Sequence, residues 1–118
     1  MGAPYEVLME VPAGLADAVR SILEEDHLPV RDVSGNDGLM DGVLTLGVAL
    51  TAVKLVEIGL KIYNHLRNRV NRDEDKNKIT VKVQVGDVKT TVEIDLRQTQ
   101  PTIELRLKSL QSKLSKTA

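Results

Sequence analysis

Two runs of alternating apolar residues, separated by Gly86-Asp87, restrict the fold of this chain more than any other feature. The alternating residues are Ile79, Val81, Val83 and Val85 in the first run and Val88, Thr90, Val92 and Ile94 in the second. A period of two is typical of strands with one buried face, and a Gly-Asp pair suits a two-residue hairpin turn. Folding at this turn sets Ile79 opposite Ile94 and Lys78 opposite Asp95, so both faces pair well. We therefore predict an antiparallel hairpin over about residues 78–96.

The segments on both sides of this hairpin also carry simple periodic patterns. Residues 5–11 alternate like a strand, and residues 13–25 have apolar side chains at helical spacing. Leu28–Val33 has the length of a second, short strand. Pro101 suits the first turn of a last helix, which we expect at about residues 101–115.

The segment between the two β units is unusually apolar. No charged residue occurs between Gly42 and Val53, and polar residues then recur every three to four positions from Lys54 onward. This spacing predicts one long apolar helix over about residues 39–70. We expect a single α+β domain over residues 1–118, with a small mixed sheet in β-α-β-α-β-β-α order around one long central apolar helix.

The expected long helix has more apolar surface than one sheet face can cover. It could be the core helix of the domain, it could pack against a second copy or a partner protein, or its segment 43–53 could enter a bilayer. A membrane span needs about 20 mainly apolar residues, and Lys54, Glu57 and Lys61 interrupt the run. We therefore favour contacts with protein. The candidate interface residues are Val48, Ala52, Leu55, Val56, Gly59, Leu60 and Tyr63.

Residues that carry enzyme chemistry are sparse. The chain has no cysteine, which excludes thiolate nucleophiles and cysteine-based zinc sites. Its two histidines, His27 and His65, lack further ligands at metal-site spacing. Asp32, Asp37 and Asp41 lack the alternate spacing and the closing Glu of a calcium loop. We expect no catalytic residue, no metal and no cofactor, and so a protein that is not an enzyme.

The charge balance argues against a nucleic-acid partner. The chain has 16 Lys and Arg against 17 Asp and Glu, and its only aromatic residues are Tyr5 and Tyr63. Nucleic-acid binders usually gather excess positive charge on one face, and single-strand binders add aromatic stacking platforms. We expect no nucleic-acid binding. The absence of cysteine fits a reducing cytoplasm, which is the location we expect.

The order of these segments resembles that of a known family. The motifs that carry the likeness are a first strand ending in Val11-Pro12, a second strand near Leu28-Pro29-Val30-Arg31, a Gly-containing turn, and a long apolar helix ending in Leu66-Arg67-Asn68-Arg69 before a Val-rich hairpin. Over nearly the whole chain they resemble the effector-associated constant component 1 domains of bacterial conflict and defence systems. Family members often carry Trp where this chain has Tyr63, and Arg-Gly near Val30-Arg31-Asp32.

The resemblance implies a function through protein contacts. Domains of this family occur beside or fused to effectors such as peptidases, and the family is not known for catalytic residues. We therefore expect a non-enzymatic adaptor or oligomerisation domain, forming a homo-oligomer, a complex with an effector encoded nearby, or both. A membrane-associating subunit that inserts residues 43–53 is the alternative.

Overall fold

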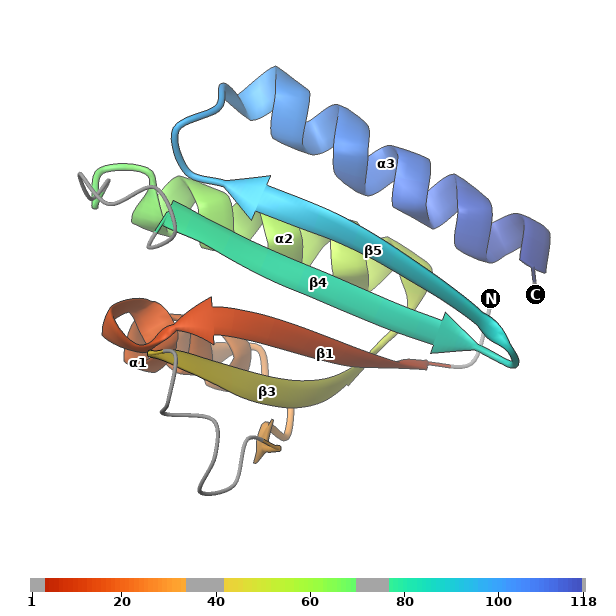
Figure 1. The fold of residues 1–118 in the computed structure, drawn as a ribbon, viewed down its shortest axis with the longest axis horizontal. Coiled ribbons are helices and arrows are strands. Elements are labelled where there is room, and N and C mark those ends of the chain that lie inside the picture. Colours follow the sequence, from red (N-terminus) through yellow and green to blue (C-terminus); the bar gives the residue numbers. More distant parts are fainter. Residues whose placement is uncertain (1–3, 34–41, 70–76, 118) are drawn as a thin grey trace.

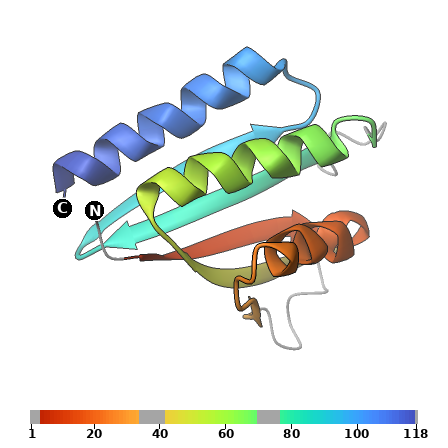
Figure 2. The same ribbon diagram turned by 180° about the vertical axis from the view of Figure 1, so that it is seen from behind.

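The computed structural model describes residues 4–33, 42–69 and 77–117 of the chain. Within these ranges, five strands form one antiparallel sheet, and three helices lie together on one of its faces (Figures 1 and 2). The strand order across the sheet is β2-β3-β1-β4-β5. The predicted α+β class is confirmed. The prediction of a mixed sheet is wrong, because all four strand pairings are antiparallel.

The elements follow one another in β-α-β-β-α-β-β-α order. The strands are β1 (Tyr5–Pro12), β2 (Arg31–Asp32), β3 (Val43–Leu50), β4 (Lys78–Val85) and β5 (Val88–Asp95). The helices are α1 (Ala13–Glu25), α2 (Ala52–Leu66) and α3 (Gln100–Thr117). β1 lies at the centre of the sheet between β3 and β4, while β2 and β5 form the two edges.

The hairpin of β4 and β5 has the predicted register. Val85 pairs with Val88, Ile79 pairs with Ile94, and Lys78 pairs with Asp95. Gly86 adopts a φ of 60°, which a two-residue primed turn requires and which a residue without Cβ adopts at no steric cost. The hairpin and the C-terminal helix that follows it were therefore predicted correctly.

The predicted helix over residues 39–70 is wrong in its first part. Residues 43–50 form strand β3, and helix α2 begins at Ala52; residues 39–41 and 70 lie outside the described part of the chain. The break has a local cause, because the Thr51 hydroxyl accepts a hydrogen bond from the Lys54 backbone N–H at 3.1 Å and so caps the helix. The predicted element order therefore lacked one strand.

β3 lacks a regular alternation of apolar and polar residues because its outer face carries small residues and is partly covered: Gly47 is buried there, whereas Ala49 is exposed. Leu46, Val48 and Leu50 point into the core. On the opposite face, a Cβ at Gly47 would lie only 2.9 Å from Cγ2 of Val33, so side chains from the β2 segment pack over this glycine. Such a run lacks the alternation that marks a half-buried strand. The helix expected over residues 43–53 is thus wrong, because residues 43–50 form strand β3 and α2 begins at Ala52. β3 pairs with β1 along its length and with β2 at Leu46 and Gly47.

The core fills the space between the sheet and the three helices. It consists almost entirely of aliphatic side chains, and Tyr63 is its one buried aromatic residue among those described. The Tyr63 hydroxyl donates a hydrogen bond to the Gln98 carbonyl, and the Tyr5 hydroxyl donates to the Leu114 carbonyl at 3.3 Å. These two bonds attach β1 and α2 to the segment that contains α3.

Candidate protein-binding edge

The structure places the predicted interface residues around the domain's own core. Five of them are buried: Val48 in β3 and Leu55, Val56, Gly59 and Tyr63 in α2. Ala52 and Leu60 are partly buried against the same core. A Cβ at Gly59 would lie 2.7 Å from Cδ1 of Leu107, so α3 packs directly on this glycine. The apolar surface that we assigned to a partner is thus largely used within the chain.

The edge of the sheet formed by β2 is short and charged. β2 consists of two residues, Arg31 and Asp32, which pair with β3. The Arg31 guanidinium contacts the Glu6 carboxylate, and the Asp32 carboxylate lies 3.9 Å from the guanidinium of Arg20. A short edge with charged side chains offers little to a further strand.

The opposite edge, β5, is long. It has eight residues, and in the described part of the chain β4 is its only strand neighbour. Val85 and Val88 flank the two-residue turn, so they form a hydrogen-bonded pair, and such pairs alternate along an antiparallel ladder. Thr90 and Val92 therefore bond to β4. It follows that the backbone N–H and C=O groups of Lys89, Thr91 and Glu93 point away from the sheet.

Helix α3 runs beside this edge (Figures 1 and 2). Side chains of the two elements line a groove. The groove has a volume of about 490 Å³ and lies between residues 90–93 of β5 and one side of α3. The α3 residues that line it are Leu105, Arg106, Ser109, Leu110 and Lys113. Leu105 is 70% exposed, and Val88 at the start of β5 is 51% exposed. We refer to this feature as the β5–α3 groove.

Part of this groove was detectable in the sequence. Leu105 falls outside the apolar face of α3, which consists of Ile103, Leu107, Leu110 and Leu114. A leucine on the polar side of a helix is a weak signal, since single exposed apolar residues are common. The position of β5 at an edge had no signal, because strand order depends on contacts between distant segments.

The sheet face opposite the helices carries a second hollow. It has a volume of about 690 Å³ and is lined by residues that include Leu8, Lys82 and Gln84, together with Lys89 and Thr91 of β5. Lys82 donates to Glu10 at 2.9 Å across this face. The hollow therefore borders the β5 edge from the side opposite to α3.

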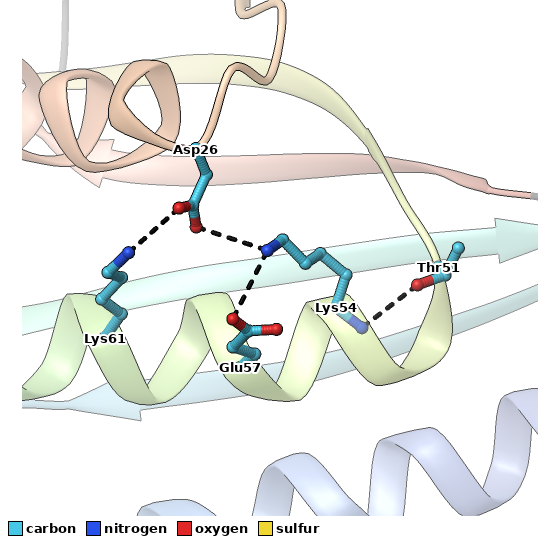
Figure 3. Close-up of polar contacts among 5 residues, drawn as sticks. All are labelled: Asp26, Thr51, Lys54, Glu57 and Lys61. Carbon is cyan, nitrogen blue, oxygen red and sulfur yellow. Dashed lines mark hydrogen bonds and ion pairs between the residues drawn. The ribbon is translucent and has the colours of Figure 1, made fainter.

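A group of charged side chains joins α1 to α2 (Figure 3). Asp26, at the end of α1, lies 3.1 Å from the amino group of Lys61 and 3.5 Å from that of Lys54. The hydrogen bond from Lys61 holds the pKa of Asp26 below its ordinary value of 3.8. These ion pairs link the end of α1 to α2 and so stabilise the packing of the two helices.

A second anchored carboxylate lies at the end of β5. Asp95 accepts hydrogen bonds from the backbone N–H of Arg97 at 3.0 Å and from its guanidinium at 3.2 Å. Burial raises the pKa of Asp95, but the bonds from Arg97 outweigh it, so the pKa lies below its ordinary value. Within the described ranges, no three His, Cys, Asp or Glu side chains are grouped as a metal site requires.

None of the helices in the described part of the chain combines the length and apolar character needed to cross a membrane. Comparison of the chain with protein-family models and with curated proteins finds no match. The candidate site therefore rests on the geometry of the β5 edge.

Proposed function

We propose that this chain is a non-enzymatic adaptor domain that binds protein by adding a strand to the edge of β5. The observation that carries the proposal is the eight-residue edge with outward N–H and C=O groups beside the exposed Leu105. Such an edge is a ready template for pairing, and soluble proteins usually shorten, charge or cover it. Strand addition of this kind is a common mode of peptide recognition, in which the backbone supplies affinity and side-chain pockets supply specificity.

The biological setting that we propose comes from the sequence. The resemblance to effector-associated constant component 1 domains supports a cytoplasmic adaptor in a bacterial defence system, with an effector such as a peptidase as its partner. The β5–α3 groove supports the mode of docking, in which an extended segment of the partner lies along β5 with its inward side chains over α3.

Proline at position 91 tests the mode of docking. The N–H of Thr91 points away from β4, so Thr91→Pro removes a donor from the edge without removing a bond of the hairpin. Thr91→Val is the matched control, because it keeps the N–H and favours a strand. Both variants are expected to keep the circular dichroism spectrum of the native chain.

Each variant is then co-expressed with the effector encoded beside it, and co-elution is measured by size-exclusion chromatography. We expect Thr91→Pro to weaken the complex by about tenfold or more, the cost of one or two lost hydrogen bonds and a distorted edge, and Thr91→Val to retain it. Full binding by Thr91→Pro, or no complex with the native chain, would contradict the proposal.

A further inference from the structure

We infer that the segment bound at the β5 edge is an acidic one: an extended stretch of the partner protein in which Glu or Asp occupies the alternate positions on both sides of an apolar residue. The inference rests on the proposed function, because it uses strand addition at the same edge, and it names the chemistry of the partner. It follows from the distribution of charge on α3 and from the side chains that line the β5–α3 groove.

Helix α3 restricts what can occupy this edge. It runs along β5 and past the edge of the sheet, so it covers one face of any strand that is added there (Figures 1 and 2). A folded domain that brings helices of its own to this face would collide with α3. The groove between the two elements has a volume of about 490 Å³, which is enough for a few side chains. The occupant is therefore a single extended segment.

The side of α3 that lines the groove carries only positive charge. Its charged residues there are Arg106 and Lys113. Glu104 is the one acidic residue of α3; it lies outside the groove lining, and its carboxylate is 2.9 Å from the amino group of Lys108. Within the described ranges, no carboxylate pairs with Arg106. An acidic side chain entering the groove from a partner therefore meets opposite charge on α3.

The one acidic residue of the groove lining, Glu93, belongs to β5. Its neighbour Ile94 is buried in the core, and successive side chains of a strand point to opposite faces, so the Glu93 side chain lies on the face without helices. Lys89 lies on that same face and borders the second hollow. A bound segment thus meets both signs of charge on the face without helices, and only positive charge on the face that α3 covers.

The spacing of the two basic residues sets the pattern of the segment. Arg106 and Lys113 are seven residues apart, which is a rise of about 10.5 Å along the helix. Residues four apart in a strand point to the same face and span about 14 Å, and long basic side chains cover the remaining difference. The residue midway between them faces the same way and lies beside Leu105 and Leu110. It is therefore apolar.

Three fluorescent peptides of about nine residues, the length of one strand, test the inference. The acidic probe has two Glu residues four positions apart with Val midway between them. The neutral probe has Gln and the basic probe has Lys in place of both Glu residues. Fluorescence anisotropy measures the binding of each probe to the native chain.

We expect a dissociation constant on the order of 10–100 μM for the acidic probe, and an affinity about tenfold lower for the basic probe. The neutral probe should fall between them, and about 1 M salt should reduce the difference, because it screens exposed charges. Equal affinities for the acidic and the basic probe, or no binding of the acidic probe at about 1 mM, would overturn the inference.

A charge reversal on α3 tests which residue reads the charge. Arg106→Glu should weaken the acidic probe about tenfold and strengthen the basic one. Lys108→Glu is the matched control, because it makes the same change in net charge outside the groove, and it should leave both affinities within about twofold. Circular dichroism checks that each variant is folded. An equal loss of affinity in the two variants would show an effect of net charge alone and would contradict the inference.

A nucleic acid is the other occupant that a basic groove could bind. Tighter binding of a single-stranded oligonucleotide of about ten thymidines than of the acidic probe, lost in Arg106→Glu, would assign the groove to phosphate and overturn the inference.

The Thr91→Pro variant separates this inference from the proposed function. If it binds the acidic probe as tightly as the native chain does, strand addition falls as well. If it weakens all three probes alike and the native chain does not distinguish them, strand addition stands and the preference for acidic segments falls.

Discussion

The two edges of the sheet differ in length, charge and surroundings. β2 contributes two charged residues, and their side chains are held by Glu6 and Arg20. β5 contributes eight residues, with outward backbone groups at alternate positions and an exposed leucine of α3 beside them. A long strand edge is a template for pairing with another chain, whereas a short and charged edge is not.

The largest expected effect concerns the helix beside the β5 edge. Leu107 of α3 is completely buried against α2, whereas Leu105, two residues earlier in the same helix, is 70% exposed. We predict that Leu107→Ala lowers the free energy of unfolding by about 2–5 kcal/mol, as for other large-to-small core substitutions. Leu105→Ala should change it by no more than about 0.5 kcal/mol.

Urea unfolding of the two variants measures this difference. Leu105→Ala should weaken binding of the effector in the co-elution assay although it leaves folding unchanged, which separates the β5–α3 groove from the core. Equal losses of stability at the two positions would show that Leu105 belongs to the core and that the β5 edge is covered.

A substitution in β3 tests how the β2 edge is protected. A Cβ at Gly47 would lie 2.9 Å from Val33 and 3.2 Å from the guanidinium of Arg31. We predict that Gly47→Val displaces the β2 segment, costs about 1–3 kcal/mol in the free energy of unfolding, and exposes the edge of β3 as a second site of association. Thermal unfolding and light scattering measure the two effects.

Ala49→Val is the control for this substitution, because Ala49 lies two residues further along β3 and is exposed. It should be close to neutral in stability and in association. If Gly47→Val is also neutral, the position of the β2 segment does not require a glycine at residue 47.

The smallest expected effect is acid destabilisation through two anchored carboxylates, Asp26 at the end of α1 and Asp95 at the end of β5. The folded-state pKa values of Asp26 and Asp95 both lie below the ordinary value of 3.8. Their contributions are therefore fully present above that value and are lost as the pH falls through the lower folded-state values. We predict that the melting temperature falls at the acid end of a titration from about pH 6 to about pH 3.

Asp26→Asn and Asp95→Asn identify the groups responsible. Each should lower the melting temperature near neutral pH and make its further loss in acid shallower. Acid curves parallel to that of the native chain would show that neither carboxylate contributes.

The sequence predicted the parts of the fold in which local signals agree. Gly86-Asp87 and the alternation on either side of it defined the hairpin and its register. β3 was missed because an apolar run without alternation fits a buried strand and a helix equally well. Thr51 was the overlooked signal, since a threonine followed by Lys54 and a periodic polar stripe indicates where α2 begins.

The candidate site was less predictable than the fold. Leu55 and Tyr63 were assigned to an interface because the expected helix had excess apolar surface, but α3 and the sheet cover that surface. Whether β5 lies at an edge depends on β1 pairing with β3 and β4. No pattern within β5 itself contains that information.

Amide hydrogen exchange along β5 tests the central claim most directly, because it reports which N–H groups are bonded. The amides of Lys89, Thr91 and Glu93 should exchange quickly, and those of Thr90, Val92 and Ile94 slowly. Equal protection of both sets would contradict an unpaired edge at β5.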